Sequence, residues 1–361
     1  MTATLELLLV GFGHVARRFV TLLDEQRGTL SRKYGLTIRI VGVATRHGRL
    51  ILPTGLEPSA VTDRFTHFLA TVPAHREMRT TPELIADVAK RRPATRDGRL
   101  VVVETTTLDI KEGQPAIDHV RAALSNGAHV VTVNKGPAAF AYHTPDKAAE
   151  KAGRRFLFEG AVMDGVPIFN LVRETLPAVT ILGFRGVVNT TTNYIITEME
   201  LGEAFEEALR AMQVAGIAEA DPSLDVDGWD AAAKTAALAN VLLEGRITPQ
   251  TVEREGIGAS TAVRAREART RKRRLKLVAR AARVRGGVQA GVALEELDES
   301  DVLANLEGQQ NALVLHTDLL GEIAIVQRGS GLTQTAYALL SDLLTIGAGV
   351  TGRTLDGRSR S

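Results

Sequence analysis

The chain has 361 residues, of which 44% are hydrophobic and 24% charged, and its formal net charge is +2. This length suits two domains of ordinary globular composition, and so balanced a charge gives no support to a nucleic-acid-binding protein. The sequence contains no cysteine, which excludes disulfide scaffolds, thiolate zinc sites and cysteine nucleophiles.

The first part of the chain alternates short apolar runs with helical patterns. Continuous apolar runs are typical of parallel strands that helices cover on both faces. We therefore predict a doubly wound parallel sheet of the Rossmann type. The predicted strands are residues 5–10, 37–44, 100–104 and 129–133, and the predicted helices are residues 14–25, 82–90 and 115–126. Residues 46–80 show little periodicity, and we expect an irregular surface insertion there.

The pattern changes after about residue 155, where a second α/β domain is expected. The predicted strands are residues 180–188, 289–294, 312–317 and 322–328, and the predicted helices are residues 194–201, 205–216, 228–243 and 334–344. Residues 264–285 are basic, and Leu275, Val278 and Ala282 recur at helical spacing. A charged helix is expected there rather than an RNA- or DNA-binding segment, because no aromatic residues are interleaved for base stacking. Residues 350–361 are expected to form a flexible tail.

No segment indicates a membrane span or a targeting signal. The apolar run at residues 5–10 is too short to cross a bilayer and is interrupted by glycine. No basic region precedes a long apolar stretch, so a signal peptide is not indicated. We therefore expect a cytoplasmic protein.

The first segment that carries chemistry is an apolar strand that runs into glycines and then a helix. Residues 11–16 read Gly-Phe-Gly-His-Val-Ala, the G-x-G-x-x-A pattern of a dinucleotide-binding turn. Gly11 permits the tight turn, and Gly13 lets the backbone approach a pyrophosphate at the helix N-terminus. The cofactor contacts expected from this turn are Gly11, Phe12, Gly13, His14 and Val15.

The end of the second predicted strand bears on the choice of cofactor. An acidic residue at this place normally holds the ribose 2′-hydroxyl of NAD, but here the strand runs into Arg46. An arginine can pair with a 2′-phosphate, so we expect NADP as the favoured cofactor, with NAD possible. The alternative is that Arg46 and Arg49 are solvated loop charges.

Polar residues also follow the third and fourth predicted strands. Glu104, Thr105 and Thr106 end the third, and Asn134 and Lys135 follow the fourth. Ligands of open α/β sheets bind beyond the carboxyl ends of the strands, so these residues are expected near the cofactor. Lys135 could lie beside the reacting carbonyl. Taken singly, such residues are also ordinary polar strand ends or surface lysines.

An acidic run leads into a helix. Residues 219–230 hold five carboxylates, and Asp230 and Lys234 are four apart and share one helix face. In a cleft, this ammonium and carboxylate could polarise or protonate a substrate oxygen, whereas on an open surface they would be a routine ion pair. The spacing does not match an EF-hand calcium loop. Residues 186–194 are polar and uncharged, and suit either a bound carboxylate or simple helix capping.

Five ordered segments resemble homoserine dehydrogenases: residues 133–137, 165–169, 193–197, 218–222 and 227–234. The resemblance implies reversible, nicotinamide-dependent reduction of L-aspartate 4-semialdehyde to L-homoserine, in threonine, methionine and isoleucine biosynthesis. It implies a nucleotide-binding domain over residues 1–145, completed by residues 320–350, and a central α/β catalytic and dimerisation domain over residues 146–319. A homodimer acting on a small molecule is expected, with no nucleic-acid or membrane partner. We also expect a short monofunctional form without a C-terminal regulatory domain.

The same resemblance implies roles for particular residues. Lys234 corresponds to the catalytic lysine, Asp230 to its partner, and Lys135 to a second lysine beside the substrate. The substrate-contacting positions are Thr191, Glu219 and Asp225, and a glycine pair that returns to the cofactor corresponds to Gly329 and Gly331.

Family members often bind a monovalent cation such as sodium or potassium. The corresponding positions are Glu159, Val162, Asp164 and Val166. Two residues depart from the family pattern, because Asp164 and Thr190 each stand where glycine is usual. These two differences leave open the alternative that the protein is a related NADP-dependent dehydrogenase of another small amino or hydroxy acid. A nucleotide-binding regulator is the alternative from a different class.

Overall fold

The computed structural model describes residues 2–71, 80–91, 99–215, 218 and 221–357, in two compact units. The first unit takes Met1–Pro137, Ala141–Val166 and Gly331–Ser361, and the second takes Ala138–Phe140 and Pro167–Ser330. The contacts thus divide the chain at residues 166 and 331, whereas the sequence led us to expect boundaries at 145 and 319. Within the described residues, no helix is both long and apolar enough to cross a membrane.

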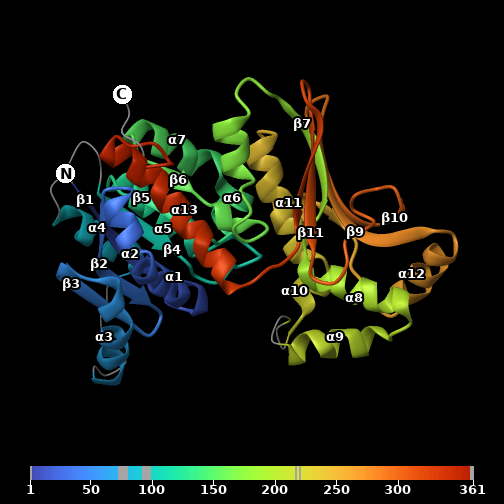
Figure 1. Cartoon of the computed structure of the whole chain (residues 1–361), viewed down its shortest axis with the longest axis horizontal. Helices are drawn as coiled ribbons and strands as arrows, with labels where there is room; N and C mark the ends of the chain where they lie inside the picture. Colours follow the sequence, from blue (N-terminus) through green and yellow to red (C-terminus); the bar gives the residue numbers. More distant parts are fainter. Residues whose placement is uncertain (1, 72–79, 92–98, 216–217, 219–220, 358–361) are drawn as a thin grey trace. The chain divides into compact units, whose positions relative to one another are not determined.

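The first unit is built on a six-stranded sheet with the order β3-β2-β1-β4-β5-β6 (Figure 1). Its strands are β1 (Ala3–Val10), β2 (Leu36–Thr45), β3 (Gly48–Leu56), β4 (Leu100–Glu104), β5 (His129–Thr132) and β6 (Phe156–Leu157). All neighbours are parallel except β2 and β3. The predicted Rossmann-type sheet is confirmed. Since the strand order reverses at β1 and β4, a crevice for a ligand is expected where these two strands end.

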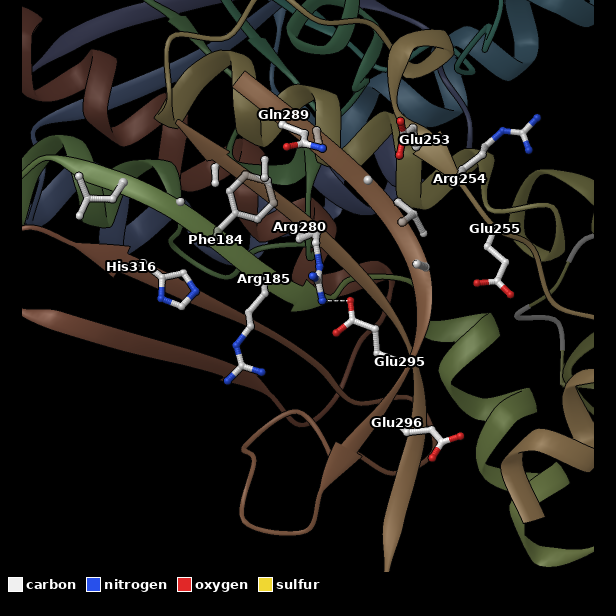
Figure 2. A pocket seen from close by; sticks show the side chains of 18 residues that line it. Phe184, Arg185, Glu253, Arg254, Glu255, Arg280, Gln289, Glu295, Glu296 and His316 are labelled. Atoms are coloured by element: carbon white, nitrogen blue, oxygen red, sulfur yellow. Dashed lines mark ion pairs between the residues drawn. The ribbon is translucent and has the colours of Figure 1, made fainter. Parts of the chain in front are cut away.

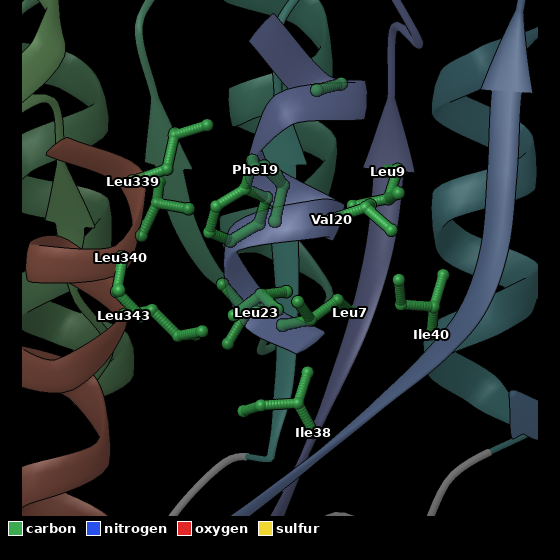
Figure 3. Close-up of a cluster of buried hydrophobic side chains, with 14 of the residues drawn as sticks. Leu7, Leu9, Phe19, Val20, Leu23, Ile38, Ile40, Leu339, Leu340 and Leu343 are labelled. Atoms are coloured by element: carbon green, nitrogen blue, oxygen red, sulfur yellow. The ribbon is translucent and has the colours of Figure 1, made fainter. Parts of the chain in front are cut away.

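Helices cover this sheet and complete its core. They are α1 (His14–Glu25), α2 (Arg27–Arg32), α3 (Pro58–Thr71), α4 (Thr81–Lys90), α5 (Ala116–Ser125), α6 (Gly136–Ala141), α7 (His143–Ala152) and α13 (Leu332–Thr351), with a 3₁₀ turn, η1, at Glu159–Ala161. Leu7 and Leu9 of β1 pack with Phe19 of α1 and with Leu339 and Leu343 of α13 (Figure 3). Each such fully buried side chain contributes roughly 1.5–3 kcal/mol. The helix α13, near the C-terminus, therefore stabilises β1 and α1, near the N-terminus.

The expectation of an irregular insertion at residues 46–80 was wrong for residues 48–71, and residues 72–79 lie outside the described residues. β3 pairs antiparallel with β2, and the helix α3 follows it and buries Val61 and Phe65. β3 was hard to recognise because Pro53 and Gly55 interrupt it and most of its residues are only half-buried. Such residues are tolerated where a strand lies at the edge of a sheet.

The second unit contains another six-stranded sheet, with the order β12-β11-β7-β9-β10-β8. Its strands are β7 (Ile181–Val187), β8 (Glu253–Arg254), β9 (Arg273–Val284), β10 (Gly287–Asp298), β11 (Asn311–Thr317) and β12 (Gly321–Gln327). All neighbours are antiparallel except β8 and β10. Its helices are α8 (Thr190–Leu201), α9 (Phe205–Val214), α10 (Ser223–Val226), α11 (Trp229–Leu242) and α12 (Thr261–Thr270), with short helical turns at Leu171–Thr175 and Pro249–Thr251. Helices α8, α11 and α12 all contact β9.

The basic segment at residues 264–285 is not one helix. It is divided between the helix α12 and the strand β9, and Ala282 is exposed although Leu275 and Val278 are buried. The spacing of these three residues coincides with a helical period by chance, while the run of five buried residues from Leu275 to Ala279 belongs to a strand covered on both faces. Lys276, within that run, is fully buried.

Candidate active site

The glycine turn after β1 suits a dinucleotide phosphate. Gly11 has a φ of +90°, and a Cβ atom there would lie 2.7 Å from the carbonyl carbon of Thr105. Gly13 begins α1, and a Cβ atom there would meet nothing within 4 Å. No side chain caps this end of α1, and its first turn carries no acidic residue. The open N–H groups and the positive end of the helix dipole therefore fit a bound pyrophosphate.

The residues beside these glycines differ in what they can offer to a cofactor. Phe12 is buried against Phe65, with ring centroids 5.3 Å apart, so only its backbone is available to a ligand. His14 is exposed and Val15 is half-buried. Arg17 lies over the ring of Phe12, with 4.7 Å between its guanidinium carbon and the ring centroid.

Glu104 makes its contacts with protein. It is fully buried at the end of β4, and its carboxylate accepts hydrogen bonds from the backbone N–H of Thr106 and the hydroxyl of Thr132, each at 3.1 Å. The ring nitrogen Nδ1 of His119 lies 3.4 Å away. Glu104 therefore holds the ends of β4 and β5 together. Thr105 makes the equivalent link to β1, because its N–H donates to the carbonyl of Val10 at 2.7 Å.

Asn134 joins the loops that follow β4 and β5. Its amide donates to the carbonyl of Thr106 at 2.9 Å, and its Oδ1 accepts from the N–H of Gly136 at 2.8 Å. Lys135 lies between these two anchored residues and is half-buried at the start of α6. The structure thus brings Thr105, Thr106 and Asn134 to the edge of the sheet where β1, β4 and β5 end.

Arg46 is exposed in the two-residue turn between β2 and β3, where its Nε donates to Nε2 of His47 at 3.0 Å. This is the carboxyl end of β2, the place from which the 2′ position of a dinucleotide is read. Gly331 is the N-cap of α13 in the first unit, whereas Gly329 falls in the second unit.

The four positions considered for a cation lie in or directly after the turn η1. Glu159 is buried, and its N–H donates to the carboxylate of Asp342 on α13 at 2.9 Å. Val162 is buried, and the N–H of Val166 donates to a backbone carbonyl in the same segment. Asp164 has a φ of +52° and accepts from the hydroxyl of Thr335 at 3.0 Å. The described part of the chain holds no group of three or more His, Cys, Asp or Glu suited to a metal ion.

The second unit carries an acid–base cluster at the start of α11. The Nζ of Lys234 lies 2.8 Å from Oδ2 of Asp230 and donates to the carbonyl of Val188 at 2.7 Å. The side chains of Lys234 and Asp230 are each 15% exposed. This burial distinguishes the pair from the surface ion pair that the i,i+4 spacing alone would equally allow.

Asn189 organises this cluster. Its amide donates to the carboxylate of Asp225 at 2.7 Å and to that of Asp230 at 2.8 Å. Its Oδ1 accepts from the N–H of Thr192 at 2.8 Å, so the same residue caps α8. One side chain therefore holds two carboxylates beside one ammonium and fixes them to the start of a helix.

Asp225 carries a shifted pKa. Burial raises the pKa of its carboxyl group, and the neighbouring charge of Asp230 raises it further. Hydrogen bonds from Asn189 and Thr191 and the charge of Lys234 act in the opposite direction. A titratable group set between such opposed influences is typical of an active site.

The other sequence-predicted residues of this unit are placed as follows. Thr191 is buried in the first turn of α8 and bonds Asp225. Thr190 accepts a hydrogen bond from the amide of Asn311 at 2.9 Å, so its hydroxyl is bonded within the unit. Glu219 lies outside the described residues.

Sequence reasoning did not single out Asn189 or the carbonyl of Val188 as site groups. The only signal was the polar run at residues 186–194, which also suits simple capping. Asn189 in fact does both, and only the fold shows that Asp225 and Asp230 lie within reach of its amide.

A hollow of about 1100 Å³ lies elsewhere in the second unit, over β7, β8, β9 and β10 (Figure 2). Arg185, Arg280 and Glu295 line it, and Arg280 is ion-paired with Glu295. None of Asp225, Asp230 and Lys234 lines it. Cavity size alone therefore does not identify the reactive cluster of this unit.

Comparison with known proteins covers both units. Residues 167–344 match the model of the family "Homoserine dehydrogenase", and residues 11–159 match "Homoserine dehydrogenase, NAD binding domain". The chain is 35% identical over 344 residues to the NAD(+)-dependent homoserine dehydrogenase of Pseudomonas canavaninivorans, covering 94% of this chain and 96% of that protein. Among solved structures, a homoserine dehydrogenase from Thiobacillus denitrificans matches with a TM-score of 0.79 and 29% identity, covering 97% of this chain and 75% of the other. A hyperthermophilic archaeal homoserine dehydrogenase in complex with NADPH matches with a TM-score of 0.75 and 27% identity, covering 95% and 98%.

Proposed function

The chain belongs to the homoserine dehydrogenase family, and on that premise we propose how its residues perform the reaction. It is an NAD(P)-dependent oxidoreductase that acts on a CH–OH group and interconverts L-homoserine and L-aspartate 4-semialdehyde. The observation that carries the residue assignment is the largely buried Lys234–Asp230 pair, held by Val188 and Asn189.

Lys234 is proposed as the group that faces the reacting oxygen. A bound nicotinamide supplies or accepts the hydride. During reduction, negative charge develops on the aldehyde oxygen, and the Lys234 ammonium stabilises that charge and serves the proton transfer. Asp230 and the carbonyl of Val188 fix the direction of the ammonium. Because this arrangement exists before substrate binds, little reorganisation is needed as the reaction proceeds.

The substrate's own ammonium group needs carboxylates. Asp225 is proposed for this role, with Glu219 as a second carboxylate and Thr191 as a hydroxyl contact. The support is that Asn189 and Thr191 hold Asp225 in a partly dehydrated position, where a charged partner lowers the cost of its ionisation. Lys135 is proposed as a second lysine for the substrate, on the strength of its place between Asn134 and Gly136 at the end of β5.

For the cofactor, we propose NADP in preference to NAD. The turn at Gly11 and Gly13 accommodates either dinucleotide, and the preference depends on Arg46 at the end of β2. Two of the similar proteins differ on this point, since one relative is NAD(+)-dependent and one solved neighbour is in complex with NADPH. A sodium or potassium ion at Glu159, Val162, Asp164 and Val166 is proposed as a further component, and the cytoplasm as the place of the reaction.

We further propose that the active form is a homodimer assembled on the second sheet. Register pairs place Ala324 of β12, Val314 of β11, Arg185 of β7 and Arg280 of β9 in one row on one face of the sheet. Val314 is buried, whereas the other three are exposed or half-buried. Next to this row, Val326 is 43% exposed, and Arg185 and Arg280 of the row line the hollow of Figure 2. The exposed part of this face is suited to pairing with a second copy. Sedimentation equilibrium should give a dimer that Arg280→Glu weakens, because the substitution leaves Glu295 without its ion-pair partner and sets a second carboxylate beside it on the proposed interface, while Arg210→Glu on α9 leaves the dimer intact.

The enzyme assay decides between substrates. Oxidation of L-homoserine with NADP and NAD should be compared with oxidation of a panel of other small hydroxy acids and amino alcohols. Homoserine should give the highest kcat/KM. A higher kcat/KM for another member of the panel would favour the second candidate function, a dehydrogenase of a related small acid. Asp164 and Thr190, which stand where glycine is usual, are the reason for considering it.

A further inference from the structure

Lys276 is a buried lysine that the proposed mechanism does not use. It lies on β9 with no exposed surface, and its pKa is lowered to about 8, chiefly by burial. Its Nζ donates to Oδ1 of Asn193 on α8 at 3.0 Å and to the backbone carbonyl of Leu306. A fully buried ammonium is costly, so its retention calls for a role that a well-packed apolar residue would not fill.

Asn193 makes two further contacts with the segment that contains Leu306. Its amide donates to the carbonyls of Gly308 and Gln310, each at 3.0 Å. Together, Lys276 and Asn193 bind three backbone carbonyls of the segment 306–310, and we call these two residues the Lys–Asn clamp. The next residue, Asn311, donates to the hydroxyl of Thr190 at 2.9 Å.

The first turn of α8 is therefore held at two points. Asn193 donates to backbone carbonyls of the segment 306–310, and Thr190 accepts a hydrogen bond from Asn311, the residue that follows this segment. This is the turn that begins at Asn189, whose amide holds Asp225 and Asp230. Val188, which accepts from Lys234, directly precedes it. A shift of this turn by a few tenths of an ångström would move the partners of the reactive ammonium and of both carboxylates at once.

We propose that Lys276 and Asn193 are positioning residues for the dehydrogenase reaction, which fix the first turn of α8 and thereby the hydrogen bonds that Asn189 and Val188 make to the acid–base cluster. The inference rests on the proposed function of that cluster. Three charged groups surround Lys276 besides its partners: Glu200 on α8, Arg274 on β9 and Glu307 in the following loop. Glu200 is itself ion-paired with Arg274 at 2.7 Å, so Lys276 is left to bind Asn193 and the backbone.

The first test uses Lys276→Met, Asn193→Ala and the double variant in the full chain, with Arg273→Met as the control. Arg273 is the exposed first residue of β9, and its guanidinium donates to a carbonyl of β10 rather than to α8. Each single variant of the clamp should lower kcat for homoserine oxidation about tenfold or more, with the KM for the nicotinamide cofactor unchanged. The double variant should lose little more than either single one, because the two residues act as a unit.

Two further readouts separate positioning from general stability. Loss of the Asn189 hydrogen bond removes an influence that lowers the pKa of Asp225, so the acid limb of the kcat/KM profile should move to higher pH in both clamp variants. Hydrogen–deuterium exchange of the peptide 188–193 should be faster in them than in wild type and in Arg273→Met, since the N–H of Thr192 donates to Asn189. The exchange measurement needs no substrate. It therefore tests whether the clamp holds the first turn of α8 even if the enzyme does not oxidise homoserine.

The proposal is overturned if a clamp variant exchanges the peptide 188–193 at the wild-type rate, or if its kcat stays within twofold of wild type with an unmoved acid limb. If Lys276→Met does not yield folded protein, Asn193→Ala removes the same contact from the other side, and its result decides.

Discussion

The Nζ of Lys234 lies 2.8 Å from the Oδ2 of Asp230, one turn earlier on the same helix. An i,i+4 pair of this kind on an open surface contributes only about 0.3–0.5 kcal/mol. Here both side chains are largely buried, and the ammonium also donates to the carbonyl of Val188 at the end of β7. The Lys234 ammonium is therefore held both by its own helix and by the residue that follows β7, and these two contacts fix its direction. A surface ion pair lacks the second contact.

The two glycines of the nucleotide turn should respond differently to the same substitution. Gly11→Ala should lower the unfolding midpoint, because φ is +90° and the new Cβ would lie 2.7 Å from the backbone of Thr105. Gly13→Ala should leave that midpoint unchanged, since the new Cβ meets nothing within 4 Å, but should weaken cofactor binding by obstructing the pyrophosphate. Thermal unfolding and a fluorescence titration with NADPH check both results. Unchanged NADPH affinity in Gly13→Ala would contradict the assignment of this turn.

Asp225 should cost the protein stability at neutral pH. Its folded-state pKa is raised above the ordinary value of 3.8, so the folded state disfavours the ionised form, and this cost disappears as the pH falls below the unfolded value. Asp225→Asn should therefore raise the free energy of unfolding at pH 7, with a gain that fades in acid, while activity falls. Urea unfolding at a series of pH values measures the effect.

Asp221 provides a control, because its ionised carboxylate should stabilise the folded protein, whereas that of Asp225 should destabilise it. Hydrogen bonds from Ser223 lower its pKa, so Asp221→Asn should lose stability at pH 7, a loss that also fades in acid. A lower free energy of unfolding for Asp225→Asn than for wild type at pH 7 would show that Asp225 is a structural carboxylate rather than a site carboxylate.

The cofactor preference should depend on Arg46. Arg46→Glu should lower kcat/KM with NADP relative to NAD by about tenfold to a hundredfold, the effect of losing one charged hydrogen bond of about 1.5–3 kcal/mol. Arg121→Glu, the same charge change on the surface of α5, should leave the ratio as in wild type. If the ratio is equally unchanged in Arg46→Glu, the exposed arginine at the end of β2 is a solvated charge.

The periodicity of the sequence predicted the sheet of the first unit because its strands are continuous apolar runs. The predicted elements from residues 5–10 to 129–133 agree with the structure to within one or two residues at each end. β3 was missed because it lies at the edge of the sheet. An edge strand can contain proline and need not alternate apolar and polar residues. β9 was misassigned because Leu275, Val278 and Ala282 fit a helical period, and only the pairing with β7 and β10 distinguishes the two structures.

Residue spacing by itself predicted site residues only where they are close in sequence, and the others were predicted from the family resemblance. Asp230 and Lys234 share a helix face, and Gly11 and Gly13 share a turn, so spacing sufficed. Asn189 could not be assigned this way, since its bonds to Asp225 and Asp230 span 36 and 41 residues. Glu104 was expected to face a cofactor from the end of its strand, but its hydrogen bonds to Thr106 and Thr132 direct it into the protein.

The most direct test of the account is homoserine oxidation by wild type and by Lys234→Ala, each with NADP and with NAD. Loss of a positioned donor to the developing oxygen charge should lower kcat by about 10²–10³, with the midpoint of thermal unfolding near that of wild type. Lys147→Ala, which removes an exposed lysine from α7, should retain full activity. A folded Lys234→Ala enzyme with kcat within a few fold of wild type would contradict the central claim.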